Sequence, residues 1–165
     1  MDYSPIQIEK KARDKDKANR ELIKNLNKKY SRDLDELFQN AHYRAFMKID
    51  CLNCAICCKS LGPRLNNQDI ERLAKFLKMK SSVFIESCLH IDEDNDYVFK
   101  RMPCIFLDND NKCRVYEQRP KACREYPHTD RKKIHQILTL TLKNSYVCPA
   151  VNEIFDEIRN RKEKR

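Results

Sequence analysis

Apolar side chains between about Arg20 and Phe46 recur at steps of three and four residues, the spacing of one helix face. The pattern is carried by Ile23, Leu26, Tyr30, Leu34, Leu37, Phe38, Ala41 and Ala45. We therefore expect a helical extension over residues 20–48, broken near Ser31. The preceding residues 1–19 are almost all charged or polar, which predicts a disordered lead-in.

Short helical patterns recur in the remaining residues 49–165. Ile70, Leu73, Ala74 and Leu77 predict a short helix with a cap near Asn67. A second short helix is expected after Ser81 and Ser82. A final helix is indicated by the apolar spacing over residues 151–158.

Two stretches favour strands. The residues from Tyr97 to Tyr116 surround a cluster of turn-forming side chains at 108–111, which predicts a hairpin. Apolar and polar residues alternate over 134–142, which predicts a further strand. The expected fold class is α+β: a small module of short helices and a β-hairpin, preceded by the helical extension.

Cysteine changes this picture, because the 165 residues include nine cysteines and only one glycine. The first twenty residues contain no apolar run typical of a signal peptide, and no stretch approaches the roughly 18 apolar residues of a membrane span. We therefore expect a cytoplasmic protein with no membrane association. Thiols stay reduced in that compartment, which favours metal ligation over structural disulfides or buried free thiols.

Four cysteines lie within the stretch "CLNCAICCK": Cys51, Cys54, Cys57 and Cys58. Two residues between thiolates allow both sulfurs to reach one zinc ion at about 2.3 Å. The same step opens the ferredoxin run that binds a [4Fe–4S] cluster, although the fourth ferredoxin cysteine is missing here. Side chains of neighbouring residues point apart in an extended chain, and this stretch has no glycine to relieve a bend. We therefore expect Cys57 and Cys58 to face different surroundings.

The stretch "CLNCAICCK", then "PCIFLDNDNKCRVYEQRPKACREYP" and a late Cys148 together resemble the CxxCxxCC, or YkgJ-like, family of zinc- or iron-chelating domains. The resemblance covers about residues 51–149. It implies eight metal ligands: Cys51, Cys54, Cys57, Cys58, Cys104, Cys113, Cys123 and Cys148. Its further signature matches Tyr116, Arg119, Pro120, Arg124 and Pro127. Cys88 lies outside the pattern and is expected to be a buried free thiol.

Two arginines, Arg119 and Arg124, bracket Cys123. Four thiolates on one zinc ion leave a net charge of about −2, which is costly to bury without nearby donors or cations. We expect both arginines to donate hydrogen bonds to thiolates or to cluster sulfide, around the ligands themselves. The alternative is ion pairing at the surface with Glu117 or Glu125.

Thiolate ligands suit both zinc and an iron–sulfur cluster. The ferredoxin-like opening favours [4Fe–4S], as does the resemblance, since larger relatives include a flagellin lysine methylase with iron–sulfur chemistry. The resemblance thus leaves open an Fe–S-dependent protein methyltransferase-like enzyme or component. A Gly-rich nucleotide loop is excluded because Gly62 is the only glycine.

The net charge of +9 raises a third possibility, a basic nucleic-acid-binding module. Acidic residues are interleaved with the basic ones almost everywhere, which makes that alternative weaker. The sequence therefore predicts a metal-binding protein that contains zinc or a [4Fe–4S] cluster. A protein partner at the N-terminal helix is a further expectation.

Overall fold

The computed structural model describes residues 4–27 and 32–163, and the chain divides into two compact units. Unit 1 consists of Met1–Ile56 and Pro127–Arg165, and unit 2 consists of Cys57–Tyr126. The sequence suggested one module over residues 49–165. The structure instead joins the last part of that module to the N-terminal helices.

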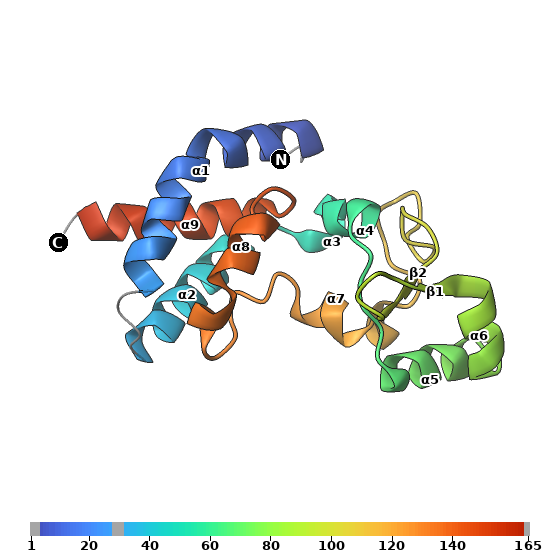
Figure 1. Cartoon of the computed structure of the whole chain (residues 1–165). Coiled ribbons are helices and arrows are strands. Elements are labelled where there is room, and N and C mark those ends of the chain that lie inside the picture. The colour runs from blue at the N-terminus through green and yellow to red at the C-terminus, as the bar shows by residue number, and fades with distance from the viewer. Residues whose placement is uncertain (1–3, 28–31, 164–165) are drawn as a thin grey trace. The chain divides into compact units, whose positions relative to one another are not determined.

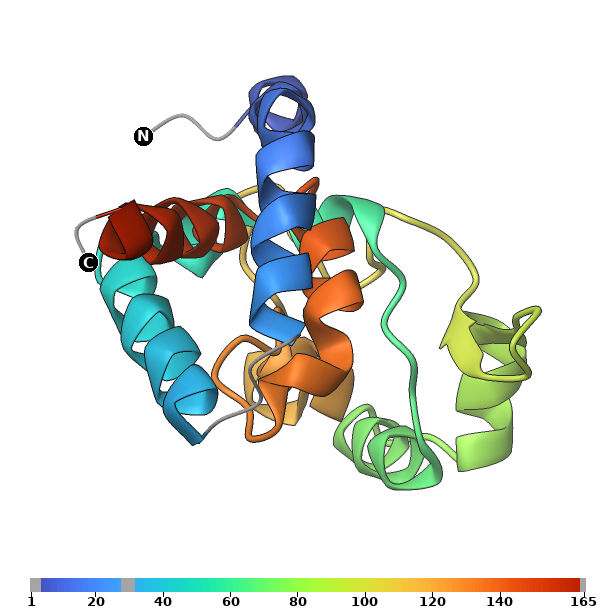
Figure 2. The same ribbon diagram turned by 60° about the vertical axis from the view of Figure 1, so that its left-hand side comes forward.

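Unit 1 is helical. Its elements are α1 (Pro5–Asn27), α2 (Arg32–Phe46), α3 (Cys51–Cys54), the 3-10 helix η2 (Ile134–Ile137), α8 (Leu138–Asn144) and α9 (Pro149–Glu163). Figures 1 and 2 show α1, α2, α8 and α9 gathered in one group. Phe38 of α2 lies in its core with Ile154, Phe155 and Ile158 of α9, and all four side chains are fully buried. The predicted final helix is thus confirmed.

Residues 5–19 belong to helix α1, so the predicted disordered lead-in is wrong over this range. The apolar side chains here are few, but Ile8 and Ala12 are both buried. Helix α1 packs against α8 and α9 within unit 1, which supplies the tertiary contacts that a charged helix needs. A protein partner at this helix stays a prediction. The predicted break near Ser31 lies outside the described residues.

Polar pairs join α1 to α9. They advance together along both helices: Lys11 with Glu153 at 2.8 Å, Lys15 with Asp156 at 2.6 Å, and Asn19 with Arg159. The two helices therefore run in the same general direction. Among the described residues, no helix is both long and apolar enough to cross a membrane.

Unit 2 contains shorter elements. They are α4 (Ile56–Ser60, which begins in the last residue of unit 1), α5 (Asn67–Phe76), α6 (Ser81–Cys88), β1 (Leu89–Ile91), β2 (Tyr97–Phe99), the 3-10 helix η1 (Tyr116–Gln118) and α7 (Lys121–Glu125). Leu73, Phe84, Phe99 and Phe106 are buried together in its core. The two predicted short helices are confirmed as α5 and α6. The cap of α5 is Asn66, one residue before the predicted position.

The sheet of unit 2 is a two-stranded antiparallel hairpin. Its register pairs Leu89 with Phe99, His90 with Val98 and Ile91 with Tyr97. β2 therefore pairs with the strand before it, whereas the predicted hairpin placed its partner after it. At the predicted turn the chain does reverse, but Leu107 and Cys113 form only an isolated bridge. The α+β class is confirmed, and the hairpin lies earlier than expected.

The strand predicted over residues 134–142 is wrong, because this stretch forms η2 and α8. Leu138 and Leu142 lie four residues apart and are both buried, so the same apolar residues also satisfy a helical spacing. The Asp35 carboxylate of α2 accepts hydrogen bonds from the backbone N–H groups at the start of η2, including that of Ile134 at 2.9 Å. This distant contact has no signal in the local pattern.

Candidate metal centre

The first two cysteines belong to a capped helical turn. Asp50 is the N-cap of α3 and accepts a hydrogen bond from the backbone of Leu52 at 2.9 Å. Its second carboxylate oxygen accepts from the Asn53 side chain at 2.8 Å. Asp50 thereby fixes the turn that presents Cys51 and Cys54.

Ala55 ends this turn in the left-handed conformation, with φ 49°. Its N–H donates to the carbonyl of Cys51, and a new helical turn, α4, begins at the next residue. The reversal that seemed to need glycine is therefore made at an alanine. Left-handed backbone is unfavourable for a residue with a Cβ, by about 1–2 kcal/mol.

Cys57 and Cys58 lie in α4, and their sulfurs are 4.0 Å apart. The two sulfurs do not diverge, because the stretch is helical and not extended. The expectation that the two thiols face different surroundings stays a prediction. Two sulfurs bound to one tetrahedral zinc at about 2.3 Å would be about 3.8 Å apart. The adjacent pair thus has a sulfur separation close to that of two ligands of one metal.

Four cysteines of unit 2 lie close enough for their charges to shift the pKa values of one another: Cys58, Cys104, Cys113 and Cys123. The Cys104 N–H donates to the carbonyl of Cys58 at 2.9 Å, which ties α4 to the later segment. Cys113 lies at the bridge across the turn from Leu107. Cys123 lies in α7. Three separate segments therefore deliver the four thiols to one half-buried region.

The pKa values of these thiols show the cost of that arrangement. Burial raises the pKa of Cys104 to about 11 and that of Cys123 to about 12, and neighbouring thiolates add to both shifts. Burial also raises the pKa of Cys113. A hydrogen bond with Cys57 lowers the pKa of Cys58 to about 7, against the effect of burial and with help from Arg119 and Lys59. Burial and mutual repulsion therefore oppose deprotonation of these thiols, and added positive charge would favour it.

Arg119 supplies part of that charge, since it lowers the pKa of Cys58, Cys113 and Cys123. Its guanidinium lies over the Tyr116 ring, 3.3 Å from the centroid, and its Nε donates to the Tyr116 carbonyl at 2.7 Å. This geometry holds the arginine in place.

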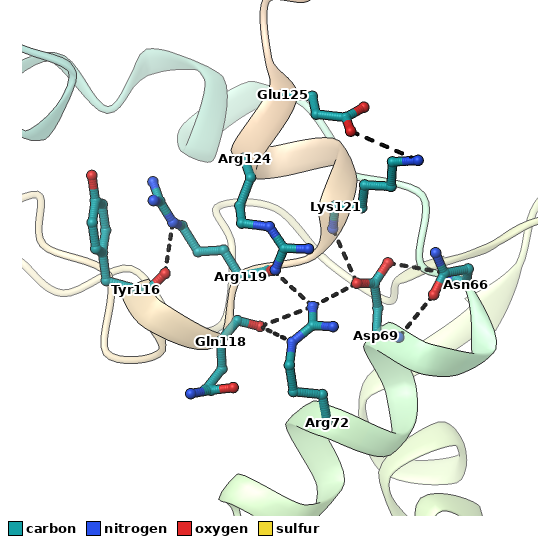
Figure 3. A network of polar contacts seen from close by, with 9 residues as sticks. All are labelled: Asn66, Asp69, Arg72, Tyr116, Gln118, Arg119, Lys121, Arg124 and Glu125. Atoms are coloured by element: carbon teal, nitrogen blue, oxygen red, sulfur yellow. Dashed lines mark hydrogen bonds and ion pairs between the residues drawn. The ribbon is translucent and has the colours of Figure 1, made fainter.

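Arg124 lies differently. Its Nη1 donates to the backbone carbonyl of Arg119 at 2.7 Å (Figure 3). Glu125, expected as a surface alternative for the arginines, pairs with Lys121 at 3.7 Å. Arg124 therefore contacts the backbone that carries Arg119.

Unit 1 contains a second thiol group: Cys51, Cys54 and Cys148. Burial raises the pKa of Cys148 to about 12, and Cys51 and Cys54 add to the shift. Cys54 is buried in a small apolar cluster with Ile8 and Ile56. Helix α1 thus contributes an apolar side chain over this group.

Cys88, the cysteine left out of the ligand set, packs half-buried against the apolar core of unit 2. Its sulfur lies 3.5 Å from the Ser87 hydroxyl. None of the nine cysteines forms a disulfide in the described part of the chain.

Asp69 and Arg72 of α5 were not predicted from the sequence, although both contact the segment between Tyr116 and Cys123. The carboxylate of Asp69, 1% exposed, accepts from the Lys121 N–H at 3.0 Å and from Arg72 at 2.5 Å. Asn66 and Asp69 have the spacing of a capping box, so the sequence indicates the cap of α5. It gives no sign of the contact between Asp69 and Lys121.

The donor set fits a metal that prefers sulfur: four thiols in a half-buried region beside an arginine. In residues 4–27 and 32–163, no three His, Cys, Asp or Glu side chains are arranged so that they could hold a metal ion as they stand.

Comparison with family models matches residues 50–149 to CxxCxxCC, whose description reads "Putative zinc- or iron-chelating domain". The match includes both thiol groups and ends just after Cys148. It leaves out α1, α2 and nearly all of α9. No curated protein and no solved structure gives a significant match.

Proposed function

We propose, from the premise that this chain belongs to the CxxCxxCC family of zinc- or iron-chelating domains, that it binds its metal through the thiols of unit 2. The ligands are Cys58, Cys104, Cys113 and Cys123. The observation that carries the proposal is their convergence from three segments into one half-buried group. Cys57 lies beside this group through its 4.0 Å contact with Cys58.

The bound group is a [4Fe–4S] cluster or a zinc ion, since each takes four thiolates. Its positive charge would offset the burial and the mutual repulsion that raise the pKa values of Cys104 and Cys123. A zinc ion would organise the fold, and a cluster would add electron transfer. Cysteines that form no disulfide suit a reducing compartment such as the cytoplasm.

Cys51, Cys54 and Cys148 form a separate group in this proposal. They are three thiols of the family pattern that lie together in unit 1. Together with Cys57 and the four thiols of unit 2, they make up the eight ligands that the family resemblance implies. Loss of one of them should therefore leave the metal of the unit 2 group in place.

Anaerobic purification followed by metal and sulfide analysis and a visible absorption spectrum tests the proposal. Sulfide with a brown chromophore identifies the cluster, and zinc without colour identifies the ion. Cys123→Ser should lose this metal, whereas the matched control Cys88→Ser should keep it. A folded wild-type chain that contains neither metal would contradict the proposal, as would equal loss in both variants.

A further inference from the structure

A buried ion pair on α5 lies where the chain turns into α7. The carboxylate of Asp69 is 1% exposed, and its Oδ1 accepts from Arg72 Nη2 at 2.5 Å. The same carboxylate completes the cap of α5, because Oδ2 accepts from the Asn66 N–H at 3.3 Å. A side chain used only to cap α5 would need no more than this second contact.

Asp69 also caps α7. The N-cap position of α7 is Pro120, which has no side chain able to accept a hydrogen bond. The first N–H of α7, that of Lys121, donates to Asp69 Oδ1 at 3.0 Å. The Asp69 carboxylate thus accepts backbone hydrogen bonds at the N-termini of both α5 and α7, although Asp69 and Lys121 are 52 residues apart in the sequence.

Arg72 fixes the residues just before α7. Its Nη2 donates to the carbonyl of Arg119 at 2.9 Å, and its Nε and Nη2 lie 3.4 Å from the carbonyl of Gln118. Figure 3 shows the guanidinium between the Asp69 carboxylate and these two carbonyls. The Arg119 carbonyl accepts from Arg124 as well, at 2.7 Å.

The fixed segment carries two groups of the thiol region. Arg119 projects from it over the Tyr116 ring, and Cys123 follows Lys121 by two residues. We propose that Asp69 and Arg72 are positioning residues for the metal site, which hold the 118–121 backbone so that Arg119 and Cys123 face the other thiols. This inference rests on the proposed function. It adds two residues that contain no sulfur and touch no metal.

Substitutions around a ligand that leave the ligand intact commonly weaken metal affinity 10- to 100-fold. Anaerobic Co²⁺ titration of the full chain under reducing conditions measures this affinity, and its thiolate-to-metal charge-transfer absorption reports how many sulfurs are bound. Asp69→Ala should weaken Co²⁺ binding at least tenfold and lower the charge-transfer intensity by about a quarter, as expected when one of four thiolates is lost. Asp69→Asn keeps an acceptor for the Lys121 N–H, so it should retain the four-thiolate spectrum.

Asn66→Ala is the matched control, because it removes the cap of α5 and leaves the contacts to residues 118–121. It should lower the melting temperature and leave both Co²⁺ affinity and the spectrum unchanged. If Asp69→Ala fails to fold, Arg72→Gln decides by the same two measurements, with the same expected losses. Four-thiolate Co²⁺ binding of wild-type affinity in the deciding variant would overturn the inference, as would an equal loss in Asn66→Ala. Absence of thiolate charge transfer in the wild type would instead refute the zinc form of the proposed function.

Discussion

Unit 1 and unit 2 both contain a thiol group, but they differ in what else stabilises them. In unit 1, four helices bury large apolar side chains such as Phe38 and Phe155 completely. In unit 2, the segment from Lys100 to Tyr126 contains only one short α-helix of five residues, α7. We therefore expect the thiols to contribute less to the stability of unit 1 than to that of unit 2. Unit 1 has a packed helical core. The last part of unit 2 also buries Phe106 and Val115, but its short elements lead us to expect that it depends on metal binding as well.

Metal removal should destabilise unit 2 and leave unit 1 stable, and this is the largest effect expected. A structural metal site contributes on the order of 10 kcal/mol, as much as the whole stability of a small domain. Chelation under anaerobic, reducing conditions should abolish amide-exchange protection over residues 100–126 and preserve it in α2 and α9. Hydrogen exchange with mass spectrometry on the full chain measures both. Equal loss of protection in the two units would contradict the difference drawn here.

Phe155→Ala tests whether the helical core stabilises unit 1 independently of the metal. Phe155 of α9 is fully buried, so its truncation should destabilise unit 1 by about 3–5 kcal/mol. Metal content should stay at the wild-type value, because the change is confined to the helical core. Denaturant unfolding and metal analysis provide the two measurements. Phe76→Ala is the control, since Phe76 is 52% exposed and its loss should have little effect.

Asp156→Asn should have a smaller, pH-dependent effect. Burial opposes ionisation of Asp156, but hydrogen bonds and charges from Lys15 and Lys11 outweigh it and lower the pKa of this carboxyl. A lowered folded-state pKa stabilises the protein above the unfolded pKa of about 4, and this stabilisation is lost as pH falls through the folded value. The variant should lose about 1 kcal/mol at pH 7, a modest cost because solvent screens these partly exposed pairs.

The measurement is denaturant unfolding of the metal-free forms of Asp156→Asn and wild type at several pH values. The difference in stability between them should begin to shrink below about pH 4, the unfolded pKa, and should vanish once the pH falls below the lowered pKa of folded Asp156. A difference that stays constant from pH 7 to pH 2 would show that the ion pairs to α1 contribute nothing.

Ala55→Gly should have the smallest effect. Glycine relieves about 1 kcal/mol of left-handed strain but removes a buried methyl group, which is worth about 0.8 kcal/mol. The two should nearly cancel. Ala150→Gly, at a fully buried position in α9, has no strain to relieve and should cost about 2 kcal/mol. Thermal unfolding compares them, and an equal cost at both sites would rule out strain at Ala55.

The sequence predicted what depends on local spacing. Ile70, Leu73 and Ala74 share one helix face, and these residues are indeed buried in α5. The family resemblance was confirmed by the match to residues 50–149. The assignment of individual cysteines as ligands stays a prediction.

Elements that depend on distant contacts could not be predicted. The charged residues of α1, such as Lys15, look disordered until α9 supplies Asp156 as their partner. The stretch after Ile134 fits a strand or a helix equally well until Asp35 of α2 caps it. The contact between the Cys57 and Cys58 sulfurs was missed for a different reason. The local conformation changes at Ala55, and an alanine gives no sign of left-handed backbone.

The parallel pairing of α1 with α9 also has a consequence for the order of synthesis. Residues of α1 leave the ribosome before the family domain exists, and α9 follows only once residues 50–149 have been made. Until then Lys11 and Lys15 have no carboxylates from α9 to pair with. The pairing of α1 with α9 is therefore a late event for every newly made chain.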